Sequence, residues 1–290
     1  MSSAIFRQLN RLQIQASKEL SGSRTGARSS HRRKPSTEFI EHRSYTAGDD
    51  IRYVDWRASA RQDGVIIRQG ELTKSVNIFI LLDCSGSMHW GAPPKSVLQK
   101  KLASMLSYLA LDYGDRLYLQ PYGGRGNKAL GPISGKGQFN STARYLDQLN
   151  YSGEASLGQA LTKLRTSVMN GGIVFILSDL LEADRLSEIL GGLPTPAWMV
   201  NVVHLLHPQE LAPVIRGSIE LEDVETHKKV NFDLTARALA KYHQRVSDWQ
   251  KRLDMACVEH HVSYTLVNTN ASLEGEVLPN LRAKNILVNR

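Results

Sequence analysis

Cysteine is scarce in this sequence, with Cys84 and Cys257 the only two among 290 residues. Two cysteines so far apart match none of the spacings by which cysteines hold a structural metal ion. A disulfide between them would also obstruct the motif that surrounds Cys84, which is described below. We therefore expect two free thiols.

Long hydrophobic runs are also absent. No apolar run reaches the roughly 18 residues that a membrane-spanning helix needs. The first 20 residues lack the uninterrupted apolar core of a secretion signal. We therefore expect a soluble, cytoplasmic protein with no membrane span.

Acidic residues are nearly missing from residues 1–35, which hold eight Lys or Arg and one acid, Glu19. This segment therefore carries +7 of the net charge of +8, and the other 255 residues carry +1. The polar composition of residues 21–35 predicts a flexible, protease-sensitive linker. Such an arm suits either a solvated tail or an arm that binds nucleic acid. Aromatic side chains that stack on bases are absent from residues 7–38, which argues against nucleic acid as a partner.

The remaining residues follow a pattern typical of an α/β fold. Apolar residues at helical spacing predict a docking helix over residues 4–20, and turn signals at Ala47-Gly48-Asp49 and Asp63-Gly64 predict strands or hairpins before residue 75. Strands are expected at 76–83, 116–122, 172–178, 198–206 and 262–268, with β-prone pieces at 218–224 and 229–233. Helices are expected at 95–113, near 141–149, and at 156–169, 184–191 and 235–259.

Alternating strands and helices indicate a mostly parallel sheet with helices on both faces. We divide the chain into an N-terminal helix with a basic linker (1–37), a β-rich segment (38–74), an α/β domain (75–270) and a tail (271–290). The glycine-rich residues 122–139 are expected to form a mobile loop. They do not form a nucleotide-binding P-loop, because Lys136 is followed by Gly137 and not by Ser or Thr.

Two of the predicted strands end on a carboxylate. Asp83 closes an apolar run, with Ser85 and Ser87 just after it, and Asp179 closes another. Because the carboxyl ends of parallel strands meet at one edge of a sheet, both acids are expected to face one crevice. Carboxylate and hydroxyl oxygens are the donors that a hard divalent cation prefers, Mg²⁺ above all and Mn²⁺ as its substitute. The alternative is that these residues only cap local turns.

The strand followed by Asp83-Cys84-Ser85-Gly86-Ser87-Met88, with a later strand and Ser178-Asp179, resembles the metal-ion-dependent adhesion site of the von Willebrand factor A fold. The resemblance implies a Rossmann-type sheet and a further threonine ligand that lies before a helix. Ala155 occupies that threonine position here, and Ser156 beside it is a possible substitute.

A second resemblance covers most of the chain, in the segment before Asp83 and in the stretch that begins "HPQEL". It is similar to a domain-of-unknown-function family that joins such a segment to a von Willebrand A-like module, although that family commonly has Asp where His207 stands. Its members often occur beside MoxR-type AAA+ ATPases, which implies a cytoplasmic adaptor or co-chaperone role. The matching residues of the first block are Arg43, Tyr45, Gly48, Asp49, Arg52, Asp55, Trp56, Ala60 and Arg61.

These family-motif residues suggest mainly a structural role. Gly48-Asp49 suits a turn, and Arg52, Asp55 and Arg61 suit pairing with nearby charges. Trp56 is expected to anchor the segment to the core, so that Trp56→Ala would cost roughly 3–5 kcal/mol. The alternative is a surface on which a partner docks.

Enzyme classes fit the Asp83 motif poorly. A dehalogenase-type phosphotransferase needs a second carboxylate where Ser85 stands, and a serine hydrolase needs glycine where Asp83 stands. We therefore expect a non-enzymatic interaction protein, in which a cation held by Asp83, Ser85, Ser87, Ser156 and Asp179 binds an acidic partner residue. A nucleic-acid-binding protein that acts through its basic arm is the alternative.

Overall fold

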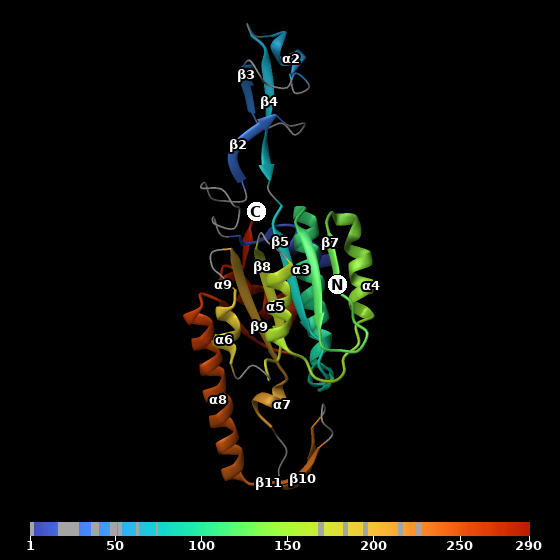
Figure 1. The fold of residues 1–290 in the computed structure, drawn as a ribbon, viewed down its shortest axis with the longest axis vertical. Helices are drawn as coiled ribbons and strands as arrows, with labels where there is room; N and C mark the ends of the chain where they lie inside the picture. Colours follow the sequence, from blue (N-terminus) through green and yellow to red (C-terminus); the bar gives the residue numbers. More distant parts are fainter. Residues whose placement is uncertain are drawn as a thin grey trace. The chain divides into compact units, whose positions relative to one another are not determined.

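The computed structural model describes residues 3–16, 29–35, 41–46, 51, 54–61, 64–73, 75–167, 171–181, 185–193, 197–213, 217–223 and 228–290 (Figure 1). Two compact units make up the chain. One joins Met1–Gln15 to Asn77–Arg290, and the other is Ala16–Val76. The first 15 residues therefore pack with the unit that follows residue 76.

A six-stranded sheet forms the centre of the larger unit, in the order β12-β9-β8-β5-β6-β7 (Figure 1). Every neighbouring pair is parallel except β6 and β7, which are antiparallel. This confirms the predicted α/β fold. The strands are β5 (Asn77–Asp83), β6 (Arg116–Tyr122), β7 (Leu130–Ile133), β8 (Gly172–Ser178), β9 (Trp198–Leu206) and β12 (Ser263–Asn268).

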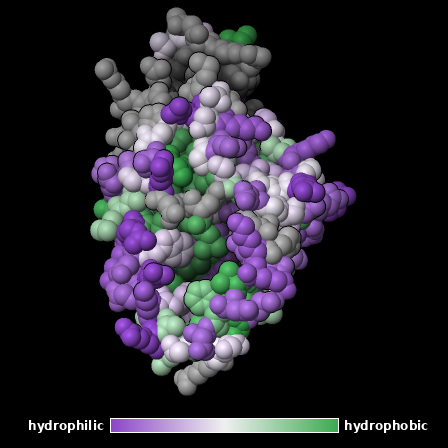
Figure 2. Space-filling model, turned by 60° about the horizontal axis from the view of Figure 1, so that its bottom comes forward, coloured by the Kyte–Doolittle hydropathy of each residue, from purple (hydrophilic) through white to green (hydrophobic). Residues whose placement is uncertain are grey.

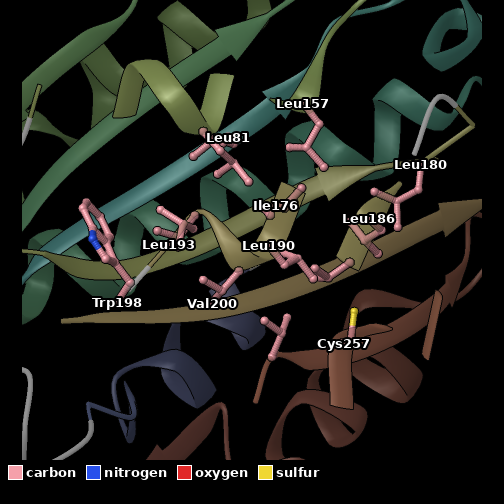
Figure 3. Packing of buried hydrophobic residues seen from close by; sticks show 14 of the residues in the cluster. Leu81, Leu157, Ile176, Leu180, Leu186, Leu190, Leu193, Trp198, Val200 and Cys257 are labelled. Carbon is pink, nitrogen blue, oxygen red and sulfur yellow. The ribbon is translucent and has the colours of Figure 1, made fainter. Parts of the chain in front are cut away.

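Helices cover both faces of this sheet. On one face, a continuous apolar cluster joins the strands to α5 (Leu157–Ser167), α6 (Leu186–Gly191) and α8 (Ala236–Glu259). Figure 3 shows Ile176 of β8 near Leu190 of α6, and Cys257 of α8 belongs to the same apolar cluster. The other face packs against α3 (Lys95–Tyr113), which is buried over most of its length.

The predicted helix over residues 4–20 is wrong beyond Leu9. The chain forms a short helix, α1 (Ser3–Leu9), and then a strand, β1 (Leu12–Ile14), which pairs antiparallel with β13 (Leu287–Asn289). Leu12 and Ile14 are buried on the same side of β1, which is the two-residue period of a strand. Leu12 also fits the helical spacing of the residues before it, and this coincidence extended the predicted helix too far. Residues 17–20 lie outside the described residues.

The glycine-rich stretch 122–139 is not entirely a loop, because β7 lies within it and pairs with β6. Gly131 permits this close pairing: a Cβ atom there would lie 2.5 Å from the carbonyl oxygen of Leu117. After β7 come a short 3₁₀ turn, Lys136–Gln138, and α4 (Phe139–Asp147). The predicted mobile loop therefore holds an edge strand of the sheet.

The smaller unit is a three-stranded antiparallel sheet, as expected for the β-rich segment. Its order is β2 (Ser29–Pro35), β4 (Ile66–Thr73) and β3 (Glu41–Ser44), with a short helix, α2 (Trp56–Ser59). The predicted flexible linker is therefore wrong for residues 29–35, which pair with β4. Residues 21–28 lie outside the described residues.

The remaining elements surround the sheet or extend from it. Among the described residues, none of the helices combines the length and the apolar character that a membrane span requires. A separate hairpin consists of β10 (Gly217–Glu222) and β11 (Lys229–Leu234). The others are η2 (Gly86–His89), α7 (Pro208–Leu211), a π-helical turn (Leu273–Val277) and α9 (Leu278–Ala283).

Candidate functional site

Two adjacent strands bring the predicted acids together. β5 and β8 are parallel neighbours in register from Ile78 with Ile173 to Leu82 with Leu177. Asp83 therefore ends its strand beside Ser178, and Asp179 follows directly. Each acid has 2% or less of its surface exposed. The structure thus places Asp83 and Asp179 at one edge of the sheet, as the strand pattern predicted.

The Asp83 carboxylate is held by hydroxyl and amide donors. Its Oδ1 accepts from the backbone N–H of Ser85 at 2.9 Å and from the Ser85 hydroxyl at 2.7 Å. Its Oδ2 accepts from the hydroxyls of Ser178 at 2.6 Å and Tyr122 at 3.4 Å. The Ser85 and Ser87 hydroxyl oxygens lie 3.0 Å apart. Because Ser85 donates its proton to Asp83, Ser87 is the donor in that pair.

Burial dominates the electrostatics of Asp83. Burial first, and the nearby Asp179 charge second, raise the pKa of this carboxyl to about 6. Hydrogen bonds from Ser178 and Ser85 act in the opposite direction but do not cancel the effect. The site therefore holds a carboxylate whose negative charge is poorly balanced.

Asp179 lies in a different environment. Its Oδ2 accepts from the Lys95 ammonium at 2.7 Å, and the same ammonium lies 2.5 Å from Glu210. Its backbone carbonyl accepts from His204 at 2.9 Å, which assigns the proton of the buried imidazole to Nε2. The next residue, Leu180, adopts a left-handed φ of 54°, a strained conformation that its packing in the core maintains.

Lys95 and Gln99 were not predicted as site residues, yet both are fully buried in the first turns of α3. The Gln99 amide donates to the carbonyl oxygens of Asp83 and Leu177, both at 2.8 Å, and so joins the ends of β5 and β8. The available signal was the spacing of four positions between Lys95 and Gln99, which puts both polar residues on the helix face that also carries Leu98 and Leu102.

Ser156 does not join the cluster. Its hydroxyl accepts from the backbone N–H of Gln159 at 3.4 Å, in the first turn of α5. Ala155, at the expected threonine position, lines the cleft with a methyl group. A backbone hydrogen bond holds the loop before α5 against the loop after β5, because the Gly153 carbonyl accepts from the Gly86 N–H at 2.9 Å. This bond brings Ala155 to the cleft.

A cleft of about 760 Å³ opens over these residues. Its polar part includes Asp83, Ser85, Ser87 and Asp179, and its apolar part includes side chains of the β10–β11 hairpin. Figure 2, which brings this end of the molecule forward, shows hydrophobic surface gathered around a hollow. The other lining residues are Trp90, Glu154, Ala155, Leu181, Glu210, Leu221, Glu222, Asp223, Lys228, Val230 and Phe232.

The hairpin is amphipathic. Its register pairs Ile219 with Phe232 and Leu221 with Val230, which places these four side chains on one face. Lys229 lies on the opposite face and pairs with Glu220 at 2.7 Å. Leu221, Val230 and Phe232 are each about half exposed, although they line the cleft. An apolar face with this exposure is typical of an interaction surface.

The donors at the cleft floor fit a weakly held hard cation. The Asp83 carboxylate and the Ser85 and Ser87 hydroxyls are suitable oxygens, and a cation would relieve the poorly balanced charge of Asp83. However, one oxygen of Asp179 already binds Lys95, and Ala155 offers no oxygen from its side chain. No group of three or more Asp, Glu, His or Cys side chains suited to a metal ion occurs in the described part of the chain.

The cysteines and the family-motif residues lie outside this cluster of oxygens. Both cysteines are free and buried, and burial raises the pKa of each thiol to about 12. Asp55 N-caps α2 by accepting from the N–H groups of Arg57 and Ala58. The Tyr45 N–H donates to the Val65 carbonyl oxygen. Arg43 of β3 lies opposite Ile67 of β4, and Arg61 is exposed.

Trp56 corrects a prediction. Its side chain is 66% exposed, so it does not anchor the segment to a core. The Asp55 cap holds α2 through the backbone and leaves the indole in solvent. Gly48, Asp49 and Arg52 lie outside the described residues.

The mostly parallel sheet, its helices on both faces and the Asp-x-Ser-x-Ser motif at the end of β5 define a von Willebrand A-like domain. The chain belongs to the family described as "Protein of unknown function DUF58", whose family model matches residues 41–252. This confirms the family membership that the sequence predicted.

Curated relatives of low sequence identity occur in mycobacteria. The chain is 24% identical over 197 residues to the uncharacterized protein Mb1516 of Mycobacterium bovis and to the uncharacterized protein Rv1480 of Mycobacterium tuberculosis. The match covers 66% of this chain and 62% of each relative. The chain thus spans less than two thirds of the length of these curated relatives.

Solved structures with some similarity include the conserved hypothetical protein BatB of Bacteroides thetaiotaomicron, with a TM-score of 0.43 and 14% identity over 73% of this chain and 98% of that one. An aerotolerance-related membrane protein of Bacteroides fragilis gives 0.44 and 16% identity over 72% and 100%. Manganese-loaded TRAP protein of Plasmodium vivax gives 0.40 and 15% identity over 74% and 77%.

Proposed function

We propose that this chain is a non-enzymatic protein-interaction module that binds its partner in the cleft between the sheet edge and the β10–β11 hairpin. The observation that carries the proposal is the apolar face of the hairpin. Leu221, Val230 and Phe232 remain about half exposed directly over a polar floor. A partner segment that packed on this face would remove apolar area from water, which is the main driving force of association.

The hydroxyls of the motif are arranged to support a charge rather than to attack a substrate. Ser85 donates its proton to Asp83, and Cys84 is a buried thiol with a pKa raised to about 12. A thiol attacks only after a base removes its proton, so the buried Cys84 is a poor nucleophile, and this favours binding over catalysis.

Mg²⁺ or Mn²⁺ bound at Asp83, Ser85 and Ser87 would supply an open coordination position for a partner carboxylate. The other charged residues of the described cleft lining are acids, apart from Lys228; these acids are Glu154, Asp179, Glu210, Glu222 and Asp223. A partner carboxylate is repelled by such a surface at short range. Binding of an acidic partner segment is therefore expected to require a divalent cation.

We propose a MoxR-type AAA+ ATPase, or a client of it, as the partner, and the cytoplasm as the location. This part rests on the resemblance of the family motif, because family members often occur beside such ATPases. The role that follows is that of an adaptor or co-chaperone, which brings a protein to the ATPase without itself catalysing a reaction.

A binding titration against the MoxR-type ATPase of the same organism tests this function. Val230→Ser and Phe232→Ser change the apolar face of the hairpin, and Asn231→Ser on its other face is the matched control. We expect at least tenfold weaker binding for the first two, unchanged binding for the control, and loss of binding when EDTA replaces Mg²⁺. Equal affinity of all four proteins, or no binding by the wild type, would refute the proposal.

A further inference from the structure

A lysine without solvent exposure lies behind the candidate cation site. Lys95 is the first residue of α3, and its side chain is 0% exposed. Its ammonium donates to Asp179 at 2.7 Å and to Glu210 at 2.5 Å. Lysine is almost never fully buried unless it is paired, because desolvating an ammonium costs several kcal/mol. The two carboxylates are therefore the reason that Lys95 can occupy this position.

The ammonium remains charged at neutral pH. Burial alone would lower the pKa of Lys95, but Asp179 and Glu210 together raise it above its ordinary value. Glu210 is itself fixed, because its second carboxylate oxygen accepts from the His207 N–H at 2.7 Å in the capping box of α7. The result is a positive charge fixed between the end of β8 and α7.

This fixed charge bears directly on cation binding. A divalent ion on the cleft floor would need a second carboxylate beside Asp83 to balance its charge, and Asp179 is the acid at that sheet edge. The Oδ2 atom of Asp179 is already engaged by Lys95, and the ammonium also repels an incoming cation. The other oxygen donors of the cleft floor, Asp83, Ser85 and Ser87, include only one acid.

We propose that the Lys95 ammonium is a built-in counter-ion of Asp179. It neutralises the carboxylate that a divalent ion would otherwise use, and so it lowers the affinity of this site for such ions. The proposal deepens the proposed function, since it concerns the same site. It assigns a physical cause to weak cation binding in addition to the missing hydroxyl at Ala155. It also predicts that removal of the ammonium strengthens cation binding, where removal of a ligand would weaken it.

Calorimetric titration with Mn²⁺ and with Mg²⁺ tests the proposal. Lys95→Met removes the ammonium and frees Asp179 and Glu210. Lys101→Met removes the same charge from an exposed position of the same helix and is the matched control. We expect at least tenfold tighter binding of both ions by Lys95→Met, and binding by Lys101→Met equal to that of the wild type.

A charge-balanced variant addresses the risk that Lys95→Met fails to fold. Lys95→Met combined with Glu210→Gln removes one positive and one negative charge, and it still releases Asp179. We expect this variant to bind Mn²⁺ at least tenfold more tightly than the wild type and to gain more thermal stability from added Mn²⁺.

Cation binding equal to or weaker than that of the wild type in the folded Lys95 variants would overturn the role of Lys95. The readout is independent of the partner. Unchanged affinity of the hairpin variants for the ATPase would therefore refute the proposed function and leave this inference standing.

Discussion

Asp83 is a residue whose protonation affects the stability of the site. Its pKa is about 6 in the folded chain, above the ordinary value of 3.8, chiefly because of burial. Below about pH 4 the carboxyl is protonated in both folded and unfolded states, so its burial does not lower the free energy of unfolding through ionisation. As the pH rises toward 6, ionisation is easier in the unfolded chain, so the folded state loses stability.

We therefore predict that the stability of cation-free Asp83→Asn, relative to the wild type, rises by roughly 3 kcal/mol between pH 4 and a pH above 6. His204 acts oppositely, because burial lowers its pKa to about 4 and favours the folded state as the pH rises toward 6.5. Denaturant titrations of the wild type and of Asp83→Asn from pH 4 to pH 8, in EDTA, isolate the Asp83 contribution, because the effect of His204 is common to both proteins and cancels in the difference. A difference that does not grow with pH would contradict this assignment.

A substitution at Ala155 tests whether cation binding can be strengthened. Ala155 lines the cleft at the position where the metal-ion-dependent adhesion site has a threonine ligand. Ala155→Thr should tighten Mn²⁺ binding several-fold, because it adds a hydroxyl oxygen to a cluster with one available acid. Ala160→Thr, in α5 away from the cleft, serves as the control in the same calorimetric titration. Equal affinity of both variants would show that position 155 does not reach the cation.

Trp56 is predicted to matter little for stability. With 66% of its side chain exposed, Trp56→Ala should lower the free energy of unfolding by about 0.5 kcal/mol or less. Denaturant midpoints of the two proteins measure the difference. A loss of about 3 kcal/mol would restore the interpretation of Trp56 as an anchor.

At the scale of elements, α3 connects the parts of the site. Its first turns carry both Lys95, which binds the end of β8 through Asp179, and Gln99, which joins β5 to β8. The Gln99 side-chain oxygen also accepts from Tyr151 at 2.7 Å. Protein groups thus satisfy both the nitrogen and the oxygen of the Gln99 side-chain amide.

Gln99→Leu should cost roughly 2–4 kcal/mol, because it leaves two buried carbonyl groups and one hydroxyl without their partner. Thermal unfolding measures the loss, and Gln148→Leu at an exposed position is the control. A melting temperature equal to that of the control would mean that another donor satisfies the strand ends.

The central strands could be predicted from sequence because continuous apolar runs such as residues 77–82 have no other stable location than the inside of a sheet. β1 could not, since Leu12–Ile14 pairs with Leu287–Asn289 at the far end of the chain. Spacing within 20 residues contains no information about that pairing. β7 was missed because its glycine and proline normally interrupt strands.

The acidic part of the site followed from the same strand pattern, because Asp83 and Asp179 end neighbouring parallel strands. Lys95 did not, since a lysine at the start of a helix usually points to solvent. Its burial depends on Glu210, which is 115 residues away. The apolar face of the hairpin was likewise hidden, because alternation in β10 and β11 does not reveal whether a core covers them.

At the scale of the whole molecule, charge and apolar surface are unevenly distributed. The excess of basic residues belongs to residues 1–35, whereas the charged residues in the described lining of the cleft are all acidic except Lys228. The exposed Trp56 belongs to the smaller unit. The chain therefore offers a partner two different surfaces, and we assign binding to the cleft.

Hydrogen–deuterium exchange of the chain, alone and saturated with the MoxR-type ATPase in millimolar Mg²⁺, tests that assignment most directly. The account predicts slower exchange of backbone amides in β10, β11 and residues 84–91, with residues 54–61 unchanged. Protection confined to residues 54–61, with the hairpin and the loop after β5 exchanging as in the free chain, would contradict it.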